Sequence, residues 1–171
     1  MTDALSKLAT TDALTGISNR RIFMENGERL FAEAKRYNRD FAILIMDIDK
    51  FKSINDIYGH PVGDKVLIHT AKASIELLRE TDTFARIGGE EFGILLPETG
   101  PVHAAKVAEK IRSEVEGLHF TTENGKVIHQ TVSIGITNYT PEITDLNELI
   151  EKCDGALYRA KNTGRNKCIH F

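Results

Sequence analysis

An unbroken apolar run at residues 41–46 predicts a central strand, which we expect to extend to residue 49. A run of this length is typical of a strand buried on both faces. Asp47 and Asp49 close it, and side chains two residues apart on a strand point to the same face. A carboxylate at the end of a buried strand is costly unless it is paired or bound to a metal. Either aspartate could therefore be a metal ligand or the N-cap of a following helix.

Apolar residues recurring three and four positions apart predict helices on both sides of this strand. Ser18 or Asn19 can cap the first helix. Arg20 and Arg21 in its first turn oppose the helix dipole, so they are either solvated or have a second duty. The expected helices cover residues 18–37, 51–58, a segment from the turn at 59–64 to about residue 80, 101–116 and 145–162.

Two further apolar segments, at residues 83–85 and 92–96, are separated by Gly88 and Gly89 and predict a β-hairpin. A smaller hairpin is expected at 120–128. Two single strands are expected at 130–137 and 167–171. Strands that occur both as a hairpin and between helices predict an α+β fold. We expect a ferredoxin-like βαββαβ core with a mixed, mainly antiparallel sheet, elaborated by an extra helix and the small hairpin.

Composition narrows the functional class. The 171 residues are 41 % hydrophobic, which suits one domain with a sizeable core. The net charge of −3 gives no basic field for nucleic acid, and Trp is absent. The two cysteines have neither CxxC nor zinc spacing and favour reduced thiols in a cytosolic protein. No apolar run is long enough to cross a bilayer.

Glu90 and Glu91 sit at the tip of the predicted hairpin, directly after its two glycines. Taken alone, this is most often an ordinary turn with solvated acids. In the predicted core, however, the hairpin lies in the same sheet as the central strand, so these glutamates could meet Asp47 and Asp49. Carboxylates gathered in this way repel one another unless they are protonated or neutralised.

Oxygen ligands without His or Cys favour Mg²⁺ or Mn²⁺ over zinc. Such sites keep positions open for phosphate oxygens. Lys52 and a basic C-terminal region could balance phosphate charge, although a solvated basic helix end is the simpler interpretation. The pattern predicts metal-dependent phosphoryl or nucleotidyl transfer from a nucleoside triphosphate. No Walker P-loop is present, which argues against an ordinary ATPase.

Several longer motifs, in order, resemble a GGDEF-domain diguanylate cyclase with a GGEEF signature. They are DALTGISNRR at 12–21, DIDKFKSIND at 47–56, YGHPVGD at 58–64, GGEEF at 88–92 and ALYRAKNTGRN at 156–166. The resemblance implies a palm-like fold related to nucleotide cyclases. It also implies condensation of two GTP molecules into cyclic di-GMP and two pyrophosphates. We expect a connecting segment at 1–10 and the GGDEF catalytic domain at 11–171.

The resemblance implies a role for each residue of the acidic site. Asp47, the backbone carbonyl of Ile48, and Glu90 would hold Mg²⁺ or Mn²⁺. Glu91 would be the proton acceptor for the attacking 3′-hydroxyl or an accessory metal ligand, since the metal alone can activate that hydroxyl. Lys52 would stabilise phosphate charge in the transition state.

The resemblance also implies a substrate-binding set. An amide at Asn55 and a carboxylate at Asp64 match the hydrogen-bonding edges of guanine. The remaining substrate-binding residues are those that would line the nucleotide site or contact the triphosphate: Phe51, His60, Lys161 and Arg165.

Arg79 and Asp82 resemble the RxxD inhibitory site, at the usual short distance before the glycines. Arg79 would fork onto guanine or phosphate of cyclic di-GMP, and Asp82 would accept from guanine. A second basic residue, Lys110 or Arg112, would complete this site.

A symmetric product made from two GTP molecules implies a homodimer in which each half presents its GTP to the other. We expect weak self-association, raised in the parent protein by an upstream sensory or coiled-coil segment. The expected location is the cytoplasm, with a membrane-anchored parent also allowed. Two alternatives remain at this point: a module that binds cyclic di-GMP or GTP without turnover, and a cyclase with a different base preference.

Overall fold

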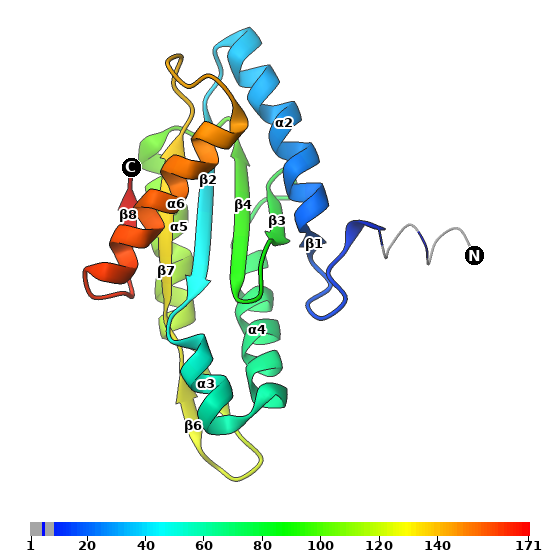
Figure 1. The fold of residues 1–171 in the computed structure, drawn as a ribbon, viewed down its shortest axis with the longest axis vertical. Coiled ribbons are helices and arrows are strands. Elements are labelled where there is room, and N and C mark those ends of the chain that lie inside the picture. Colours follow the sequence, from blue (N-terminus) through cyan, green and yellow to red (C-terminus); the bar gives the residue numbers. More distant parts are fainter. Residues whose placement is uncertain (1–4, 6–8) are drawn as a thin grey trace.

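The computed structural model describes residues 5 and 9–171, and within them it shows a sheet between two layers of helices (Figure 1). The expected connecting segment lies mostly outside the described residues. Six strands form the main sheet in the order β1-β3-β4-β2-β7-β8. The elements are β1 (Ser18–Asn19), α2 (Arg20–Tyr37), β2 (Phe41–Ile48), α3 (Phe51–Tyr58), α4 (His60–Ile75), β3 (Thr83–Arg86), β4 (Glu91–Pro97), α5 (Pro101–Glu116), β5 (His119–Thr121), β6 (Val127–His129), β7 (Val132–Asn138), α6 (Leu146–Asn162) and β8 (Cys168–His170).

The predicted ferredoxin-like core is confirmed. Strands β3, β4, β2 and β7 are neighbours in that order, and each neighbouring pair is antiparallel. The outer strands β1 and β8 add parallel pairs at the two edges, which makes the sheet mixed. β5 and β6 form the expected separate hairpin. The short β1, which lies within the N-terminal motif directly before α2, was not expected from the sequence.

The apolar run in β2 is buried on both faces, as predicted. Ile43 and Ile45 pack with α2 and α6. Leu44 and Met46 belong to the other cluster, with α3, α4 and α5. Figure 1 shows α2 and α6 in front of the sheet and α4 and α5 behind it. β2 therefore lies in the middle layer of three, with helices packed against both of its faces.

One helix boundary was predicted wrongly. The helix expected to reach residue 80 ends at Ile75, and the chain then makes tight turns in which Leu77 donates to the Ser74 carbonyl. The apolar spacing of the segment predicts Leu77 on the inward face of a continued helix, but Leu77 is 38 % exposed. Apolar residues continue past the end of the helix because Leu78, in the turns, still packs against the core cluster. Among the described residues, no helix is long and apolar enough to cross a bilayer.

Gly135 in β7 sets how closely α6 approaches the sheet. A Cβ atom there would overlap the Cys153 carbonyl and the Leu157 amide, which are backbone atoms and cannot rotate away. We predict that Gly135→Ala lowers the free energy of unfolding by about 1–3 kcal/mol, the usual cost of overpacking.

The matched control is Gly155→Ala in α6, where an added Cβ meets no atom within 4 Å. It should gain about 0.5–1 kcal/mol, because alanine favours a helix more than glycine does. Urea denaturation of both variants measures the difference. An equal effect of the two substitutions would contradict the packing explanation.

Candidate active site

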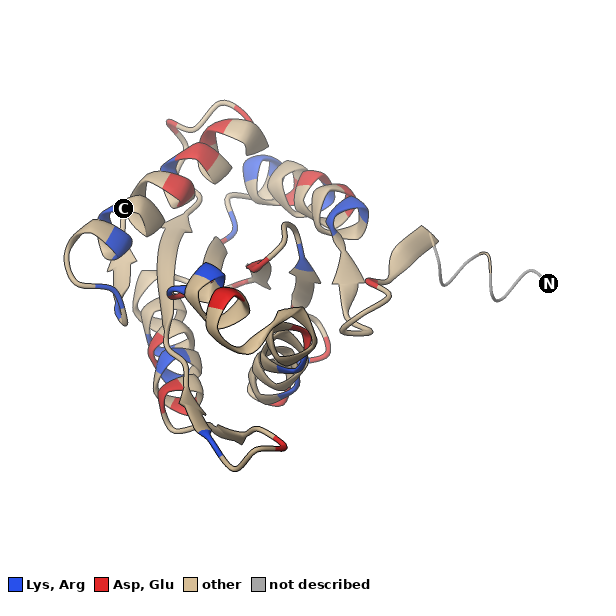
Figure 2. Ribbon diagram, turned by 60° about the horizontal axis from the view of Figure 1, so that its bottom comes forward, with Lys and Arg blue, Asp and Glu red and all other residues tan. Residues whose placement is uncertain are grey.

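The carboxylates predicted to meet do lie together, at the end of β2. Asp47 is directly opposite Glu91 in the antiparallel pairing of β2 with β4. The Ile48 amide donates to the Glu90 carbonyl at 3.2 Å. The tip of the β3–β4 hairpin is thus joined to the end of the central strand. Figure 2 looks toward this end of the molecule and shows acidic and basic residues between the helices.

Two arginines hold the carbonyl groups of the hairpin tip. Arg86 donates to the Gly89 carbonyl through two nitrogens, at 2.7 and 3.0 Å, and forms an ion pair with Asp12 at 3.3 Å. Arg20 donates to the Ile87 carbonyl at 3.2 Å. The second duty considered for Arg20 is therefore to fix this turn, which explains a cation at the unfavourable end of α2.

Burial and like charges both act on the two central carboxyls. The pKa of Asp47 is raised, mainly by burial and further by Glu90 and Asp49, while Lys161 opposes the shift. Lys161 Nζ lies 2.6 Å from Asp47 Oδ2. The pKa of Glu91 is also raised, again first by burial and then by the charges of Asp154 and Asp47. Both carboxyls therefore hold a proton more readily than exposed ones, because burial makes their charged forms costly and Lys161 offsets only part of this cost.

Asp49, the other candidate ligand, is already committed to hydrogen bonds. It accepts from Thr131 Oγ1 and Ser133 Oγ, both at 2.6 Å, and from the Asn166 amide at 3.0 Å. This choice was open from the sequence. Asp47 keeps oxygen positions for a ligand, whereas Asp49 serves the structure.

The donor set fits a hard divalent cation. Asp47 and Glu90 offer carboxylates, and the Ile48 carbonyl is adjacent in sequence. Among the described residues, no group of three or more His, Cys, Asp or Glu side chains is arranged to hold a metal. A cation bound here would therefore need further oxygens from water or phosphate, which is how Mg²⁺ is usually held. Its charge would also relieve the repulsion that raises the pKa of Asp47.

A second group of candidates lies at the junction of α3 and α4. Asn55 Oδ1 is buried and has no hydrogen-bond partner within the described part of the chain. A Cβ at Gly63 would collide with this oxygen, and it would lie 3.2 Å from the Phe51 ring. His60 and Asp64 are exposed on the first turns of α4. A buried amide oxygen without a hydrogen-bond partner lowers the stability of the folded chain and is uncommon in proteins. A hydrogen-bond donor on a ligand would remove this cost.

The remaining basic candidates take different positions. Lys52 is exposed on α3. Lys161 points from α6 to Asp47, whereas Arg165 follows α6 in a left-handed conformation and is exposed. Arg165 lines a hollow of about 360 Å³ together with Lys50 and Tyr58.

Arg79 and Asp82 are brought together at the opposite end of β4 from Glu91. Arg79 Nη2 lies 3.0 Å from Asp82 Oδ1 and also donates to the Pro97 carbonyl and to Thr99 Oγ1. Both residues line a cleft of about 850 Å³ beside α2. A seven-residue strand separates this cleft from the acidic site, by roughly 20 Å.

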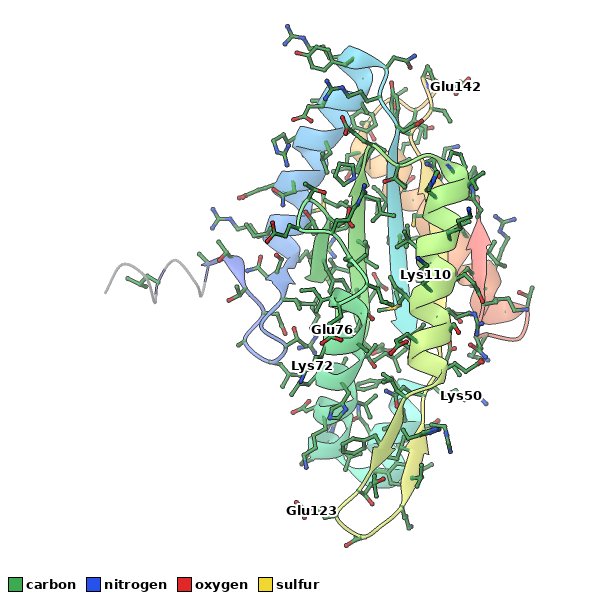
Figure 3. The ribbon with its side chains drawn as sticks, turned by 180° about the vertical axis from the view of Figure 1, so that it is seen from behind. Lys50, Lys72, Glu76, Lys110, Glu123 and Glu142 are labelled. Atoms are coloured by element: carbon green, nitrogen blue, oxygen red, sulfur yellow. The ribbon has the colours of Figure 1, made fainter. Side chains whose placement is uncertain are left out.

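The two candidates for a second basic residue are now distinguishable. Arg112 is bound to Glu109, Glu116 and Asn166, near the end of β2 that carries the acidic site. Lys110 is exposed on α5, on the side of the molecule that also carries Lys72 and Glu76 of α4 (Figure 3). Lys110 is therefore the better candidate.

Sequence reasoning missed several residues around the site. Asp154 lies on α6 and its charge acts on Glu91, yet nothing but its two-turn spacing from Lys161 marked it. Arg86 begins the hairpin stretch in the sequence, but nothing there predicts its contacts with Gly89 and Asp12. Asn166 was noticed only within a motif, because its contacts come from distant elements.

Comparisons with known proteins agree on the family. The family model "Diguanylate cyclase, GGDEF domain" matches residues 9–167. The chain is 43 % identical over 157 residues to the uncharacterized protein YhcK of Bacillus subtilis, covering 91 % of this chain and 44 % of that protein. It is 41 % identical over 165 residues to the probable diguanylate cyclase DgcT of Escherichia coli, covering 95 % and 36 %. The chain thus spans less than half the length of these relatives.

A solved structure is similar over almost the whole chain. The coiled coil and GGDEF domain of DgcB from Caulobacter crescentus, in complex with c-di-GMP, superposes with a TM-score of 0.95. The two are 30 % identical, and the match covers 99 % of this chain and 90 % of that one.

The raised pKa of Glu91 predicts a pH dependence of stability without metal. In the folded chain Glu91 retains its proton above its ordinary pKa of 4.5, so the folded state binds more protons than the unfolded state in that window. The free energy of unfolding then falls as the pH rises through the window. Glu91→Gln should remove part of this pH dependence. At pH 8 it should raise the free energy of unfolding by about 0.5–1 kcal/mol, after allowance for solvent screening.

Urea denaturation at pH 4.5 and pH 8, with chelator present, measures the effect. Glu114→Gln, an exposed carboxylate on α5, is the control and should leave the fall unchanged. The same pH dependence in wild type and Glu91→Gln would refute the prediction.

Proposed function

Because the chain belongs to the GGDEF-domain diguanylate cyclase family, we propose that it condenses two GTP molecules into cyclic di-GMP and two pyrophosphates. The observation that carries the proposal is the convergence of Asp47, Glu90 and Glu91 at the end of β2. A module that only bound nucleotide would have no need for crowded, partly buried carboxylates, which destabilise the free chain.

Asp47, the Ile48 carbonyl and Glu90 would hold Mg²⁺ or Mn²⁺. When bound, the ion would supply positive charge to the phosphate oxygens and make the attacking hydroxyl more acidic. The fit rests on the donor set and on the raised pKa of Asp47, which burial causes first and the charges of Glu90 and Asp49 second.

In the proposed reaction the 3′-hydroxyl oxygen of one GTP attacks the α-phosphorus of the other. A new oxygen–phosphorus bond forms, and the bond from that phosphorus to the β-phosphate oxygen breaks, which releases pyrophosphate. Repetition in the opposite sense closes the ring. Glu91 would accept the hydroxyl proton, and the raised pKa of its carboxyl makes it a better acceptor than an exposed glutamate. Lys52 would stabilise the charge that develops on the phosphates.

Guanine would be recognised at the α3–α4 junction. Asn55 Oδ1 is buried against Gly63, so the Asn55 side chain would turn toward the base to accept from it. Asp64 can accept from the N1–H and amino groups of guanine. Phe51 and His60 would line this site. Lys161 and Arg165 would contact the triphosphate, with Lys161 exchanging its bond to Asp47 for one to phosphate.

Each chain would present one GTP, so the active form would be a two-fold homodimer. Residues 11–171 would form the catalytic domain and residues 1–10 would connect it to an upstream sensory segment. That segment would raise the effective concentration of paired domains. The cytoplasm, where GTP is available, is the proposed location, including the case of a membrane-anchored parent protein.

Arg79 and Asp82 would form a product-inhibition site of the RxxD type, completed by Lys110. In the free chain they form an ion pair with each other inside a cleft, so ligand binding would replace that pair with contacts to guanine and phosphate. The separation from the acidic site means that inhibition would act at a distance, by restricting how two domains meet.

The central test is product formation from GTP and Mg²⁺ at several chain concentrations, followed by chromatography. We expect cyclic di-GMP, with an initial velocity that rises as the square of chain concentration when the chain is dilute. Glu90→Gln should lower the velocity by about 100-fold or more, as loss of an electrostatic group at a transition state does.

Glu98→Gln is the control, since Glu98 is exposed and forms an ion pair with Arg39 at 3.5 Å, at the end of β4 away from the acidic site. Turnover by Glu90→Gln at the wild-type rate would count against the site. A first-power dependence where light scattering detects only monomer would count against the dimer. Binding of GTP without any product would favour the receptor alternative, and product from ATP would favour a different base preference.

For the inhibitory site, Arg79→Ala should weaken inhibition by added cyclic di-GMP about 10- to 100-fold, the value of hydrogen bonds from a charged group. The velocity without added product should stay within about twofold, because Arg79 is distant from the acidic site. Arg29→Ala, in the same cleft, is the control. Superimposable inhibition curves for wild type and Arg79→Ala would remove this part of the proposal.

A further inference from the structure

The segment that joins α6 to β8 has an unfavourable backbone. Gly164, Arg165 and Asn166 follow one another with φ values of 116°, 61° and 46°. Left-handed conformations cost energy for residues that carry a Cβ atom. Two such residues in succession persist only where the surrounding structure holds them.

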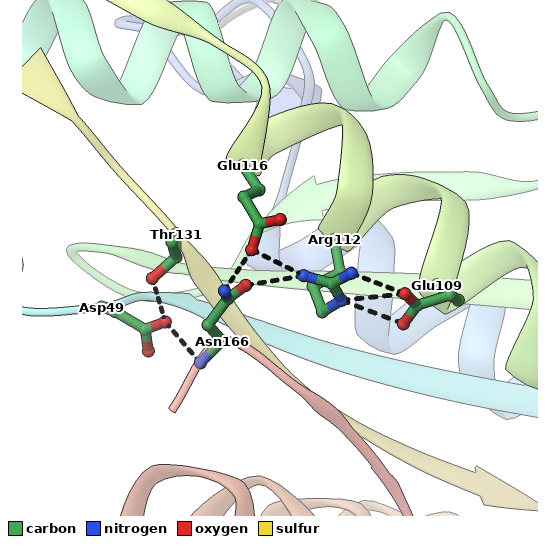
Figure 4. Close-up of polar contacts among 6 residues, drawn as sticks. All are labelled: Asp49, Glu109, Arg112, Glu116, Thr131 and Asn166. Carbon is green, nitrogen blue, oxygen red and sulfur yellow. Dashed lines mark hydrogen bonds and ion pairs between the residues drawn. The ribbon is translucent and has the colours of Figure 1, made fainter. Parts of the chain in front are cut away.

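Asn166 is the residue that the surroundings hold. Its amide donates to Asp49 Oδ2 at 3.0 Å. Its side-chain Oδ1 accepts from Arg112 Nη1 at 2.8 Å, and its Nδ2 donates to Glu116. Figure 4 shows Asn166 between the end of β2 on one side and α5 on the other. Asn166 thereby joins the segment between α6 and β8 to the end of β2 and to α5.

The partners of Asn166 are themselves fixed. Arg112 binds both oxygens of Glu109 and one oxygen of Glu116, and its side chain is only 16 % exposed. Asp49 accepts from hydroxyl groups on and next to β7. The support is therefore a rigid frame, which we call the Asp49–Arg112 clamp: Asp49, Arg112 and Glu116 around Asn166.

Arg165, next to Asn166 in the chain, carries a guanidinium group close to the clamp. Within the described residues, the Arg165 guanidinium has no ion pair or hydrogen bond, and the side chain is exposed beside the hollow with Lys50. Arg165 is linked to its neighbours through the backbone, where its amide donates to the Ala160 carbonyl. The direction in which its Cα–Cβ bond leaves the backbone is thus set by the left-handed turn.

We propose that Asn166 is a positioning residue. Held by the Asp49–Arg112 clamp, it maintains the turn that directs Arg165 toward the triphosphate of GTP. It therefore sets nucleotide affinity rather than the chemical step. This inference rests on the proposed function for the identity of the nucleotide, but the clamp itself does not.

Asn166→Gly tests the idea without a general folding defect. Glycine adopts a left-handed conformation at no steric cost and keeps the amide that binds Asp49, so only the side-chain bonds are lost. We expect KM for GTP to rise about tenfold, a typical result of losing a supporting contact, with kcat within about twofold. Asn124→Gly, in the exposed β5–β6 turn, is the matched control and should change neither.

A double-mutant cycle with Arg165→Ala separates positioning from mere stabilisation. If Asn166 acts through Arg165, Asn166→Gly should have little further effect on KM once Arg165 is absent. The same cycle is measured on the affinity of a non-hydrolysable GTP analogue, which needs no turnover. Amide hydrogen exchange at residues 164–167, without nucleotide, should be faster in Asn166→Gly than in wild type.

Additive effects of the two substitutions on analogue affinity, or unchanged exchange at 164–167, would overturn the inference. A wild-type chain that makes no product from GTP would instead contradict the proposed function. In that case the analogue cycle and the exchange measurement still decide the role of Asn166.

Discussion

Negative charge at the buried end of β2 is the constraint around which this molecule is built. Asp47 and Glu91 face each other on the two central strands, and burial first, with the charges of nearby carboxylates second, raises the pKa of both carboxyls. Lys161 offsets part of this charge. Arg20 and Arg86 hold the hairpin backbone so that the glutamates stay in place. The free chain therefore carries an electrostatic cost that a bound cation would offset.

The two aspartates of β2 divide the work, although they are only two residues apart. Asp47 meets the hairpin and α6, whereas Asp49 is saturated by β7 and by the Asn166 amide. One strand end thus carries both the site and the support for the segment that follows α6. A carboxylate whose acceptor positions are filled is well suited to holding backbone, and one with open positions is suited to holding a ligand.

The sheet also separates two regions. Glu91 begins β4, and the Arg79–Asp82 pair lies where β4 ends. Since a strand in the middle of a packed core is stiff, a ligand at the far end could influence the acidic site chiefly through how two domains meet. This arrangement is consistent with the dimer in the proposed function, in which the relative placement of two domains matters more than a change within one.

The sequence by itself determined the fold class, the order of the elements other than the short β1, and the acidic residues, because apolar period and turn residues act locally. The run in β2, the inward positions of α5 and the glycines of the hairpin all followed from neighbours in the chain. Tertiary structure alone decided that Asp47, and not Asp49, keeps acceptor positions for a ligand. It also decided that Arg20 at the start of α2 binds the hairpin, and that Asn166 links α5 to the end of β2. Those outcomes depend on contacts between residues that are 67 to 117 positions apart, or 54 for Arg112 with Asn166. No local pattern encodes them, because each contact exists only after the sheet and its helices have packed.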